Sequence, residues 1–201
     1  MILAIVNPKG GSGKSALAIN LAGALAERGP VAVVDLDTDN RSALDYASSG
    51  RLPFTVTDPH DWDGGLNRQS WAHVIADTYA RPPAEQLADL TRITDVVLMP
   101  TPPDAFALRV LARYVPEVAA TGARYAVVLT NVPPLPSRAR ARAMRDLQAG
   151  GVPVMNTYIP RAAAIANAAR AGRLARDMPG GRRARLAFDA LAQEVLTYAS
   201  P

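Results

Sequence analysis

The segment NPKGGSGKS at residues 7–15 decides the fold class expected of this chain of 201 residues. It follows an apolar run at residues 2–6 and precedes residues 16–25, where apolar side chains recur at helical spacing, so a strand, a loop and a helix are predicted. Glycine lacks a Cβ, which lets successive backbone N–H groups turn inward around an anion, and the helix adds the positive end of its dipole. The segment is therefore typical of a phosphate-binding loop, the alternative being a glycine-rich turn capped by Ser15.

The loop also contains the only two lysines of the chain, Lys9 and Lys14, because every later basic residue is an arginine. A compact ammonium group on a flexible stem fits between phosphate oxygens, where the broad, planar guanidinium group does not replace it. The use of lysine at these two positions therefore supports phosphate binding.

Apolar runs alternate with helical segments along the rest of the chain. Strands are expected at residues 31–34, 72–76, 96–99 and 125–129, with a last one at 152–159, and helices near residues 83–90, 105–120 and 138–149. Residues 41–70 are expected to form irregular surface structure. The alternation predicts an α/β fold with a doubly wound, mostly parallel sheet flanked by helices, and ligands at the carboxyl ends of the strands.

Composition limits the classes of protein to consider. A length of 201 residues with 49% hydrophobic residues suits a single domain over residues 1–201. The absence of cysteine excludes disulfides, thiolate metal sites and iron–sulfur clusters. Because no leader peptide and no apolar run of membrane-spanning length are found, we expect a cytoplasmic protein.

The phosphate loop resembles that of one superfamily in particular. Pro8 occupies the first glycine position of the general pattern G-x-x-x-x-G-K-[ST], whereas the pattern K-G-G-x-G-K-[ST], with its additional lysine, matches fully. This deviant Walker A form is similar to that of the ParA/MinD superfamily of P-loop Mg-ATPases. The resemblance implies that Lys14 contacts the bound phosphates and that Lys9 reaches the nucleotide of a partner subunit in an ATP-dependent sandwich dimer. The loop positions it assigns to nucleotide binding are Lys9, Gly10, Gly11, Ser12, Gly13, Lys14, Ser15 and Ala16.

Acidic residues follow two of the predicted strands. Asp35 and Asp37 match the family's D-x-D motif, although Thr38 and Asp39 replace its usual Pro and Gln. By resemblance Asp37 orients the attacking water, so that Lys9, Lys14 and Asp37 form the catalytic set. Mg²⁺ is then expected at Ser15, Asp35 and Asp77, where Asp77 ends a Walker B-like strand. The alternative is that these carboxylates form turns and helix caps.

The resemblance continues toward the carboxyl terminus and is greatest with small ParF-like partition ATPases. Asn131 follows a predicted strand and matches the position that reads the adenine base, unless it only forms a turn. Residues 158–161 read YIPR and match a family stretch in which Pro160 contacts the nucleotide.

Charge is distributed unevenly along the chain. Residues 1–108 hold 8 Lys and Arg against 13 Asp and Glu, whereas residues 109–201 hold 14 against 5. Basic residues without interleaved aromatic residues favour non-specific contact with the phosphate backbone of double-stranded DNA. The positions predicted to contact DNA are Arg138, Arg142, Arg161, Arg170 and Arg173, and an arginine-rich solvated surface is the alternative.

These features predict an ATP hydrolase that dimerises on binding Mg-ATP, associates with nucleoid DNA, and segregates or positions a plasmid, chromosome or protein cargo. A ParB-like or other partner protein would stimulate hydrolysis. A membrane-associated MinD-like ATPase and a P-loop biosynthetic enzyme acting on a small metabolite are alternative functions. A non-hydrolysing nucleotide-binding regulator is a third, because the residues after Asp37 depart from the family's motif. Phe188, Leu191, Val195 and Tyr198 recur at helical spacing, which we interpret as a terminal helix docked on the sheet rather than on a membrane, so no stable membrane association is expected.

Overall fold

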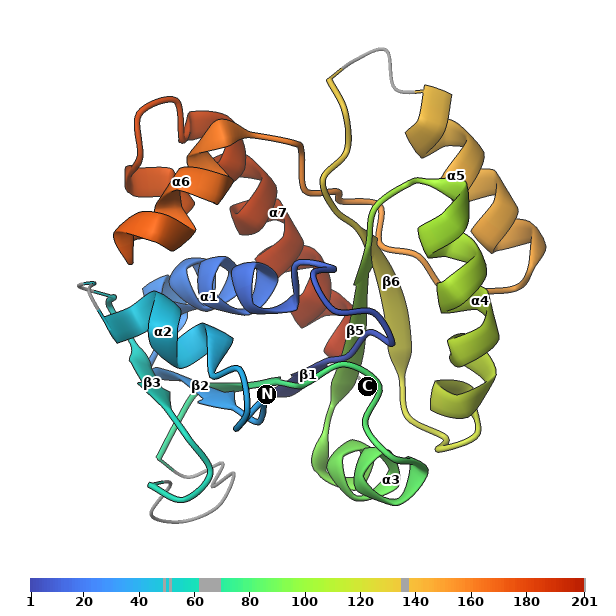
Figure 1. Cartoon of the computed structure of the whole chain (residues 1–201), viewed down its shortest axis with the longest axis horizontal. Coiled ribbons are helices and arrows are strands. Elements are labelled where there is room, and N and C mark those ends of the chain that lie inside the picture. Colours follow the sequence, from blue (N-terminus) through green and yellow to red (C-terminus); the bar gives the residue numbers. More distant parts are fainter. Residues whose placement is uncertain (49, 51, 62–69, 135–137, 201) are drawn as a thin grey trace.

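Parallel strands form the centre of the molecule in the computed structural model, which describes residues 1–48, 50, 52–61, 70–134 and 138–200. The described sheet has six strands in the order β3-β2-β4-β1-β5-β6, and every pair is parallel (Figure 1). The strands are β1 (Ile2–Ile5), β2 (Val31–Asp35), β3 (Thr55–Thr57), β4 (His73–Asp77), β5 (Val96–Thr101) and β6 (Tyr125–Leu129). The central position of β1 puts the loop that follows it in the middle of one sheet edge.

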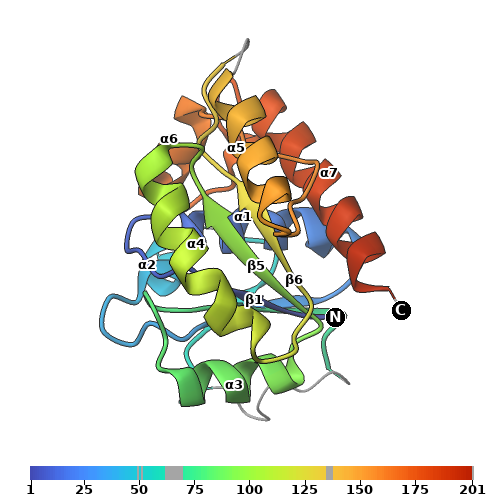
Figure 2. The same cartoon turned by 90° about the vertical axis from the view of Figure 1, so that its right-hand side faces the viewer.

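Helices cover both faces of this sheet (Figures 1 and 2). One face is covered by α1 (Lys14–Leu25), α2 (Ser42–Ser48), α6 (Ala163–Ala171) and α7 (Arg182–Ala199), with the 3-10 turns η1 (Ala26–Arg28) and η2 (Ala175–Asp177). The other face is covered by α3 (Ala84–Ile93), α4 (Ala105–Ala119) and α5 (Arg138–Ala149). The predicted doubly wound α/β fold is confirmed. Among the described helices, none has the length and apolarity needed to cross a bilayer.

The alternating side chains of β1 separate the two hydrophobic cores. Leu3 and Ile5 pack into the core beneath α1 and α7, whereas Ala4 packs into the core beneath α4 and α5. Helix α1 is enclosed on nearly all sides, because all of its residues except Ser15 and Ala16 are buried. Phe188, Leu191 and Val195 of α7 are buried in the same core, as the interpretation of a docked terminal helix requires.

The prediction of a strand at residues 152–159 is wrong. Only isolated bridges occur in this region, between Val127 and Val154 and between Val132 and Pro160. The backbone N–H groups of Asn156 and Thr157 donate to the Glu194 carboxylate at 2.6 and 2.8 Å, so they are not available to β6. Glu194 of α7 therefore interrupts a segment that still bonds to β6 on either side, through Met155 N–H to the Val127 carbonyl and Ile159 N–H to the Leu129 carbonyl.

The prediction that residues 41–70 are irregular holds for residues 52–54 and 58–61 but is wrong for residues 42–48 and 55–57. Helix α2 begins at Ser42, and β3 pairs with β2 at the sheet edge. The Asp35 carboxylate accepts hydrogen bonds from the N–H groups of Ala43 and Leu44, which caps α2 from another element. Residues 62–69 lie outside the described part of the chain.

Candidate functional site

The loop between β1 and α1 has the geometry of an anion-binding site. Gly11 and Gly13 have φ angles of 70° and 88°, in the left-handed region that glycine adopts readily. In the part of the chain that the structure describes, no side-chain cap bonds to the start of α1, whose N-cap residue is Gly13, so its first N–H groups face the loop. The buried Ser12 hydroxyl likewise has no hydrogen-bond partner in the described structure. Phosphate oxygens are acceptors that would satisfy these donors.

Asn7 braces the loop, a role that the sequence analysis missed. Its amide Nδ2 donates to the Pro100 carbonyl of β5 at 2.6 Å, and its Oδ1 accepts from the Lys9 N–H at 2.8 Å. Asn7 is buried, so these bonds fix the loop to the sheet. An asparagine directly after a buried strand was the available signal.

The two lysines of the loop lie in different surroundings. Lys14 is 8% exposed; burial lowers the pKa of its ammonium group, and the carboxylates of Asp77 and Asp37 oppose that shift. Lys9 is exposed, and its Nζ lies 5.2 Å from the ring centroid of Phe106. The buried lysine therefore faces the acidic centre of its own chain, whereas the other lysine points outward.

Asp77 at the end of β4 is the most perturbed carboxylate of the site. Both of its oxygens are buried without a hydrogen-bond partner in the described structure. Burial raises its pKa to about 7, reinforced by Asp35 and opposed by Ser15 and Lys14. A buried carboxylate beside Ser15 and Lys14, with no hydrogen bond of normal geometry in the described structure, is well suited to a cation and its bound waters.

The described residues include no group of three histidine or acidic side chains that could hold a metal ion. Mg²⁺ keeps several waters and needs few protein ligands when phosphates complete its shell. Asp77 and the Ser15 hydroxyl at the start of α1 are the two groups that could hold it here.

Asp35 lies beside Asp77, since the two residues are paired in register between β2 and β4. Its carboxylate is 1% exposed and already accepts three backbone N–H groups, from Asp37, Ala43 and Leu44. Burial raises the pKa of Asp35, and these donors oppose the shift. The observed contacts are those of a helix cap, and its metal role stays a prediction.

Asp37 is half-buried and turns the chain after β2. Its Oδ1 accepts from the Asn40 backbone N–H at 3.1 Å and from the Asn40 amide at 3.0 Å. The carboxylate therefore lies at the site on a turn that it stabilises itself.

Strained backbone gathers at the same edge of the sheet. The described non-glycine residues with positive φ are Arg41, Arg81 and Asn131, at 46°, 50° and 50°. They follow β2, β4 and β6, so three of the loops at this edge of the sheet hold one such residue. Strain of this kind is common at ligand sites.

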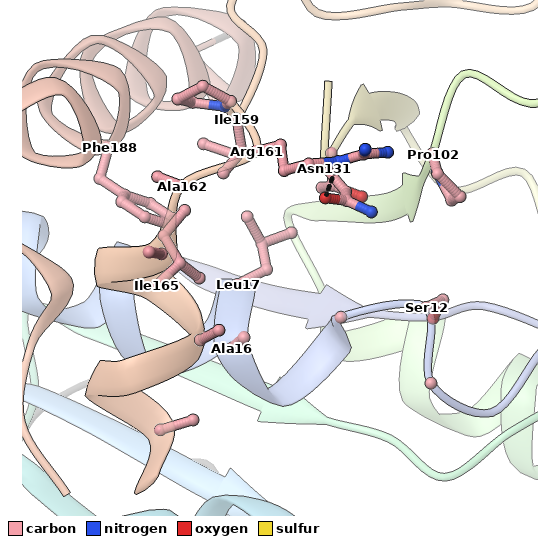
Figure 3. A pocket seen from close by; sticks show the side chains of 17 residues that line it. Ser12, Ala16, Leu17, Pro102, Asn131, Ile159, Arg161, Ala162, Ile165 and Phe188 are labelled. Carbon is pink, nitrogen blue, oxygen red and sulfur yellow. Dashed lines mark hydrogen bonds between the residues drawn. The ribbon is translucent and has the colours of Figure 1, made fainter. Parts of the chain in front are cut away.

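A cavity of about 430 Å³ opens beside the phosphate loop (Figure 3). Its floor is formed by apolar side chains that include Leu17, Ile165 and Phe188, none of which the sequence analysis assigned to the site. Asn131 and Arg161 lie together at its rim, where Arg161 Nε donates to Asn131 Oδ1 at 3.1 Å. Pro160 is buried and also lines it.

The predicted DNA-binding arginines do not form one patch on this chain. Arg170 and Arg173 lie on and just after α6, whereas Arg138 and Arg142 lie on α5, which covers the opposite face of the sheet. Arg138 and Arg142 border a second cavity, of about 750 Å³, between α4 and α5. Arg161 lines the cavity beside the phosphate loop.

A glycine-rich loop that opens a helix between parallel strands, with a buried lysine and acidic strand ends around it, defines a P-loop nucleotide-binding protein. Residues 3–175 match the model of the CbiA family, described as the CobQ/CobB/MinD/ParA nucleotide binding domain. The chain belongs to this family, and its resemblance to the ParA/MinD superfamily of ATPases is thereby confirmed.

Two relatives of similar length carry the same name, maintenance of carboxysome distribution protein A. The protein of Gloeobacter kilaueensis is 32% identical over 164 residues, which cover 79% of this chain and 76% of that protein. The protein of Halothiobacillus neapolitanus is 28% identical over 180 residues, covering 83% and 82%.

Solved structures with the same fold include two MinD proteins and one McdA protein. The MinD cell division protein of Aquifex aeolicus has a TM-score of 0.74 at 16% identity and covers 100% of this chain and 98% of that one. Pyrococcus furiosus MinD has a TM-score of 0.71 at 19% identity and covers 98% of both chains. An aspartate-to-alanine variant of Cyanothece McdA in complex with ATP has a TM-score of 0.69 at 16% identity and covers 98% of this chain and 96% of that one.

Proposed function

We propose that this protein is an ATP-driven switch that closes into a dimer on binding Mg-ATP and positions a protein cargo. The contrast between its two loop lysines is the observation that carries the proposal. Lys14 is buried against the acidic centre of its own chain, while Lys9 is exposed on the same loop, with its Nζ 5.2 Å from the ring centroid of the exposed Phe106. Lys14 can therefore contact the phosphates bound by its own subunit, whereas Lys9 is accessible to a second subunit.

In this proposal the residues of one subunit bind the nucleotide as follows. Backbone N–H groups of residues 10–16 and the Lys14 ammonium surround the phosphates. Ser15 and Asp77 would hold Mg²⁺, and the bound ion would supply positive charge against the phosphates. The apolar cavity receives the base, with Asn131 and Pro160 at its edge.

Hydrolysis requires a water molecule in line with the leaving phosphate. Asp37 lies on the half-buried turn after β2, and its carboxylate opposes the lowering of the Lys14 pKa, which supports a position near the phosphate loop. We assign to Asp37 the orientation of that water, and to the partner's copy of Lys9 the stabilisation of transition-state charge. Two active sites would therefore be completed only in the dimer.

The cargo assignment is supported by the curated relatives, both named for the maintenance of carboxysome distribution. A protein assembly is accordingly a better-supported cargo for this chain than a plasmid. A stimulating partner protein is part of the proposal, as the solved complex of MinC with MinD from Aquifex aeolicus illustrates for a protein of the same fold.

We further propose that the dimer holds nucleoid DNA through Arg170 and Arg173. Both side chains are exposed, and they lie on and just after α6, away from the cavity between α4 and α5. Contact with phosphate groups would make this binding indifferent to sequence and strongly dependent on salt.

Light scattering and DNA-binding assays on the wild type, Lys14→Ala and Lys9→Ala test the proposal. We expect the wild type to dimerise with Mg-ATP but not with Mg-ADP, and to bind DNA less tightly as salt rises. Lys14→Ala should lose nucleotide binding, while Lys9→Ala should bind ATP and fail to hydrolyse it. Hydrolysis by a monomer of Lys9→Ala at the wild-type rate would refute the dimer mechanism.

A further inference from the structure

Arg161 lies at the rim of the cavity beside the phosphate loop, although the sequence predicts it among the DNA-binding residues. Its Nε donates to Asn131 Oδ1 at 3.1 Å (Figure 3). We propose that Arg161 is a positioning residue, which fixes the orientation of the Asn131 amide and thereby selects adenine over guanine. The proposal rests on the proposed function, in that the cavity receives the base of a nucleotide.

The backbone holds these two side chains together. Arg161 N–H donates to the Val132 carbonyl at 2.7 Å, and Val132 N–H donates to the Ile159 carbonyl at 3.1 Å. These bonds flank the isolated bridge between Val132 and Pro160. The segments that carry Asn131 and Arg161 are therefore paired, and the side-chain bond adds to an arrangement that the backbone already fixes.

Asn131 is itself held in an unusual conformation. Its φ of 50° lies in the left-handed region, which asparagine tolerates better than most residues. The Thr130 N–H donates to the Thr101 carbonyl at 2.8 Å and fixes the residue just before it to the end of β5. With its backbone constrained, the main freedom left to the Asn131 amide is rotation of its side chain.

The chemistry of the pair determines which end of the amide faces Arg161. A guanidinium group donates hydrogen bonds and accepts none, so its partner atom must be the amide oxygen. Turning the amide over would place its NH₂ group against the guanidinium donor and lose the bond. The observed orientation leaves the NH₂ group and the second lone pair of the oxygen available to a ligand.

An amide in this fixed orientation distinguishes the two purines. Adenine has an amino donor beside a ring-nitrogen acceptor, a pair that an asparagine side chain matches with its oxygen and nitrogen. Guanine has a carbonyl oxygen in place of that amino group, and this oxygen would meet the amide oxygen. If the amide could turn over, its NH₂ group would meet the guanine oxygen instead. Arg161 opposes that rotation and so maintains the preference for adenine.

The test compares the affinities for Mg-ATP and Mg-GTP, measured by displacement of a fluorescent ATP analogue, in the wild type and in two variants. Arg161→Met keeps an unbranched side chain that ends at the position of the Arg161 Nε and removes the donors. We expect the preference for ATP over GTP to fall about tenfold, the value of roughly one good base contact. Arg161→Lys retains a donor and should restore most of the preference.

A double-mutant cycle separates a positioning role from a direct or structural one. In an Asn131→Ala background, Arg161→Met should leave the ratio of the two affinities unchanged, because the amide that Arg161 orients is absent. Equal losses of ATP and GTP affinity in Arg161→Met would overturn the proposal. So would a change in the ratio that persists without the Asn131 amide.

Two further outcomes are decisive. If Arg161→Met loses DNA binding while its preference for ATP is intact, Arg161 belongs to a DNA-binding surface and the inference fails alone. If the wild type binds neither nucleotide, the proposed function fails and the inference fails with it.

Discussion

Replacement of Asp77 by asparagine should stabilise the nucleotide-free protein at neutral pH, although it removes a proposed ligand of Mg²⁺. The wild-type carboxyl has a pKa raised from 3.8 to about 7, mainly by burial. Between these two values the native state keeps a proton that the unfolded chain has released, so the free energy of unfolding falls as pH rises. Asparagine has nearly the same shape and does not titrate.

The size of the effect follows from the shift. One pKa unit corresponds to about 1.4 kcal/mol, so the titration of Asp77 costs the wild type roughly 4 kcal/mol as pH rises from 4 to 8. The stability of Asp77→Asn relative to the wild type should therefore increase by roughly 1.4 kcal/mol per pH unit up to pH 7 and then level off.

Urea denaturation across this pH range, in a chelating buffer without nucleotide, measures that difference. Asp39→Asn is the matched control, because Asp39 is exposed on the neighbouring turn and the substitution changes the net charge equally. Parallel pH profiles for Asp77→Asn and the wild type would refute the assignment of the raised pKa to Asp77. Adding Mg-ATP should stabilise the wild type and have little effect on Asp77→Asn.

Three further predictions concern the scaffold of the site. Leu191→Ala in α7 removes a side chain that is 0% exposed and should lower the free energy of unfolding by about 2–5 kcal/mol in urea. Leu186 is 60% exposed, so the control Leu186→Ala should change this free energy by less than about 0.5 kcal/mol. Equal effects of the two substitutions would show that α7 is not docked. Asp104 accepts from the N–H groups of Phe106 and Ala107 at the start of α4, so Asp104→Ala should cost about 1 kcal/mol in thermal unfolding, while a similar loss in Asp104→Asn would contradict a capping role. Burial raises the pKa of Glu194, but hydrogen bonds from Thr157 and Asn156 outweigh burial and lower the pKa overall. The stabilisation that Glu194→Gln removes is therefore present above pH 4.5 and is lost as pH falls through the folded pKa. An equal difference in urea midpoint between Glu194→Gln and the wild type at pH 3 and at pH 7 would contradict this.

Local sequence signals were sufficient for much of the fold and of the phosphate loop. The glycine spacing and the apolar runs on either side predicted β1, the loop and α1, because each depends on residues that are close in sequence. The burial of Lys14 and the position of Asp77 beside it follow from the same parallel arrangement. The predicted α5 has the observed bounds, Arg138–Ala149.

The failures depend on partners distant in sequence. Glu194 takes the N–H groups that residues 156 and 157 would need for a strand, and Asp35 supplies the cap that lets α2 form. Helix α6 was not predicted, although its alanine-rich run ends at Gly172 in the left-handed conformation. The position of Arg161 depends on the pairing between residues 132 and 159, which no local pattern reveals.

The enclosure of α1 by the core determines which segments can change conformation when a nucleotide binds. A helix packed on nearly all sides moves only if its neighbours repack, so α1 is a rigid support beneath the phosphate loop. We expect a conformational change on nucleotide binding to occur in the less buried segments, residues 37–41 and 79–81, which end at Arg41 and Arg81 with their positive φ angles. ATP binding should consequently change the amide hydrogen exchange rates of those two loops, whereas the amides of α1 should exchange slowly with and without ATP.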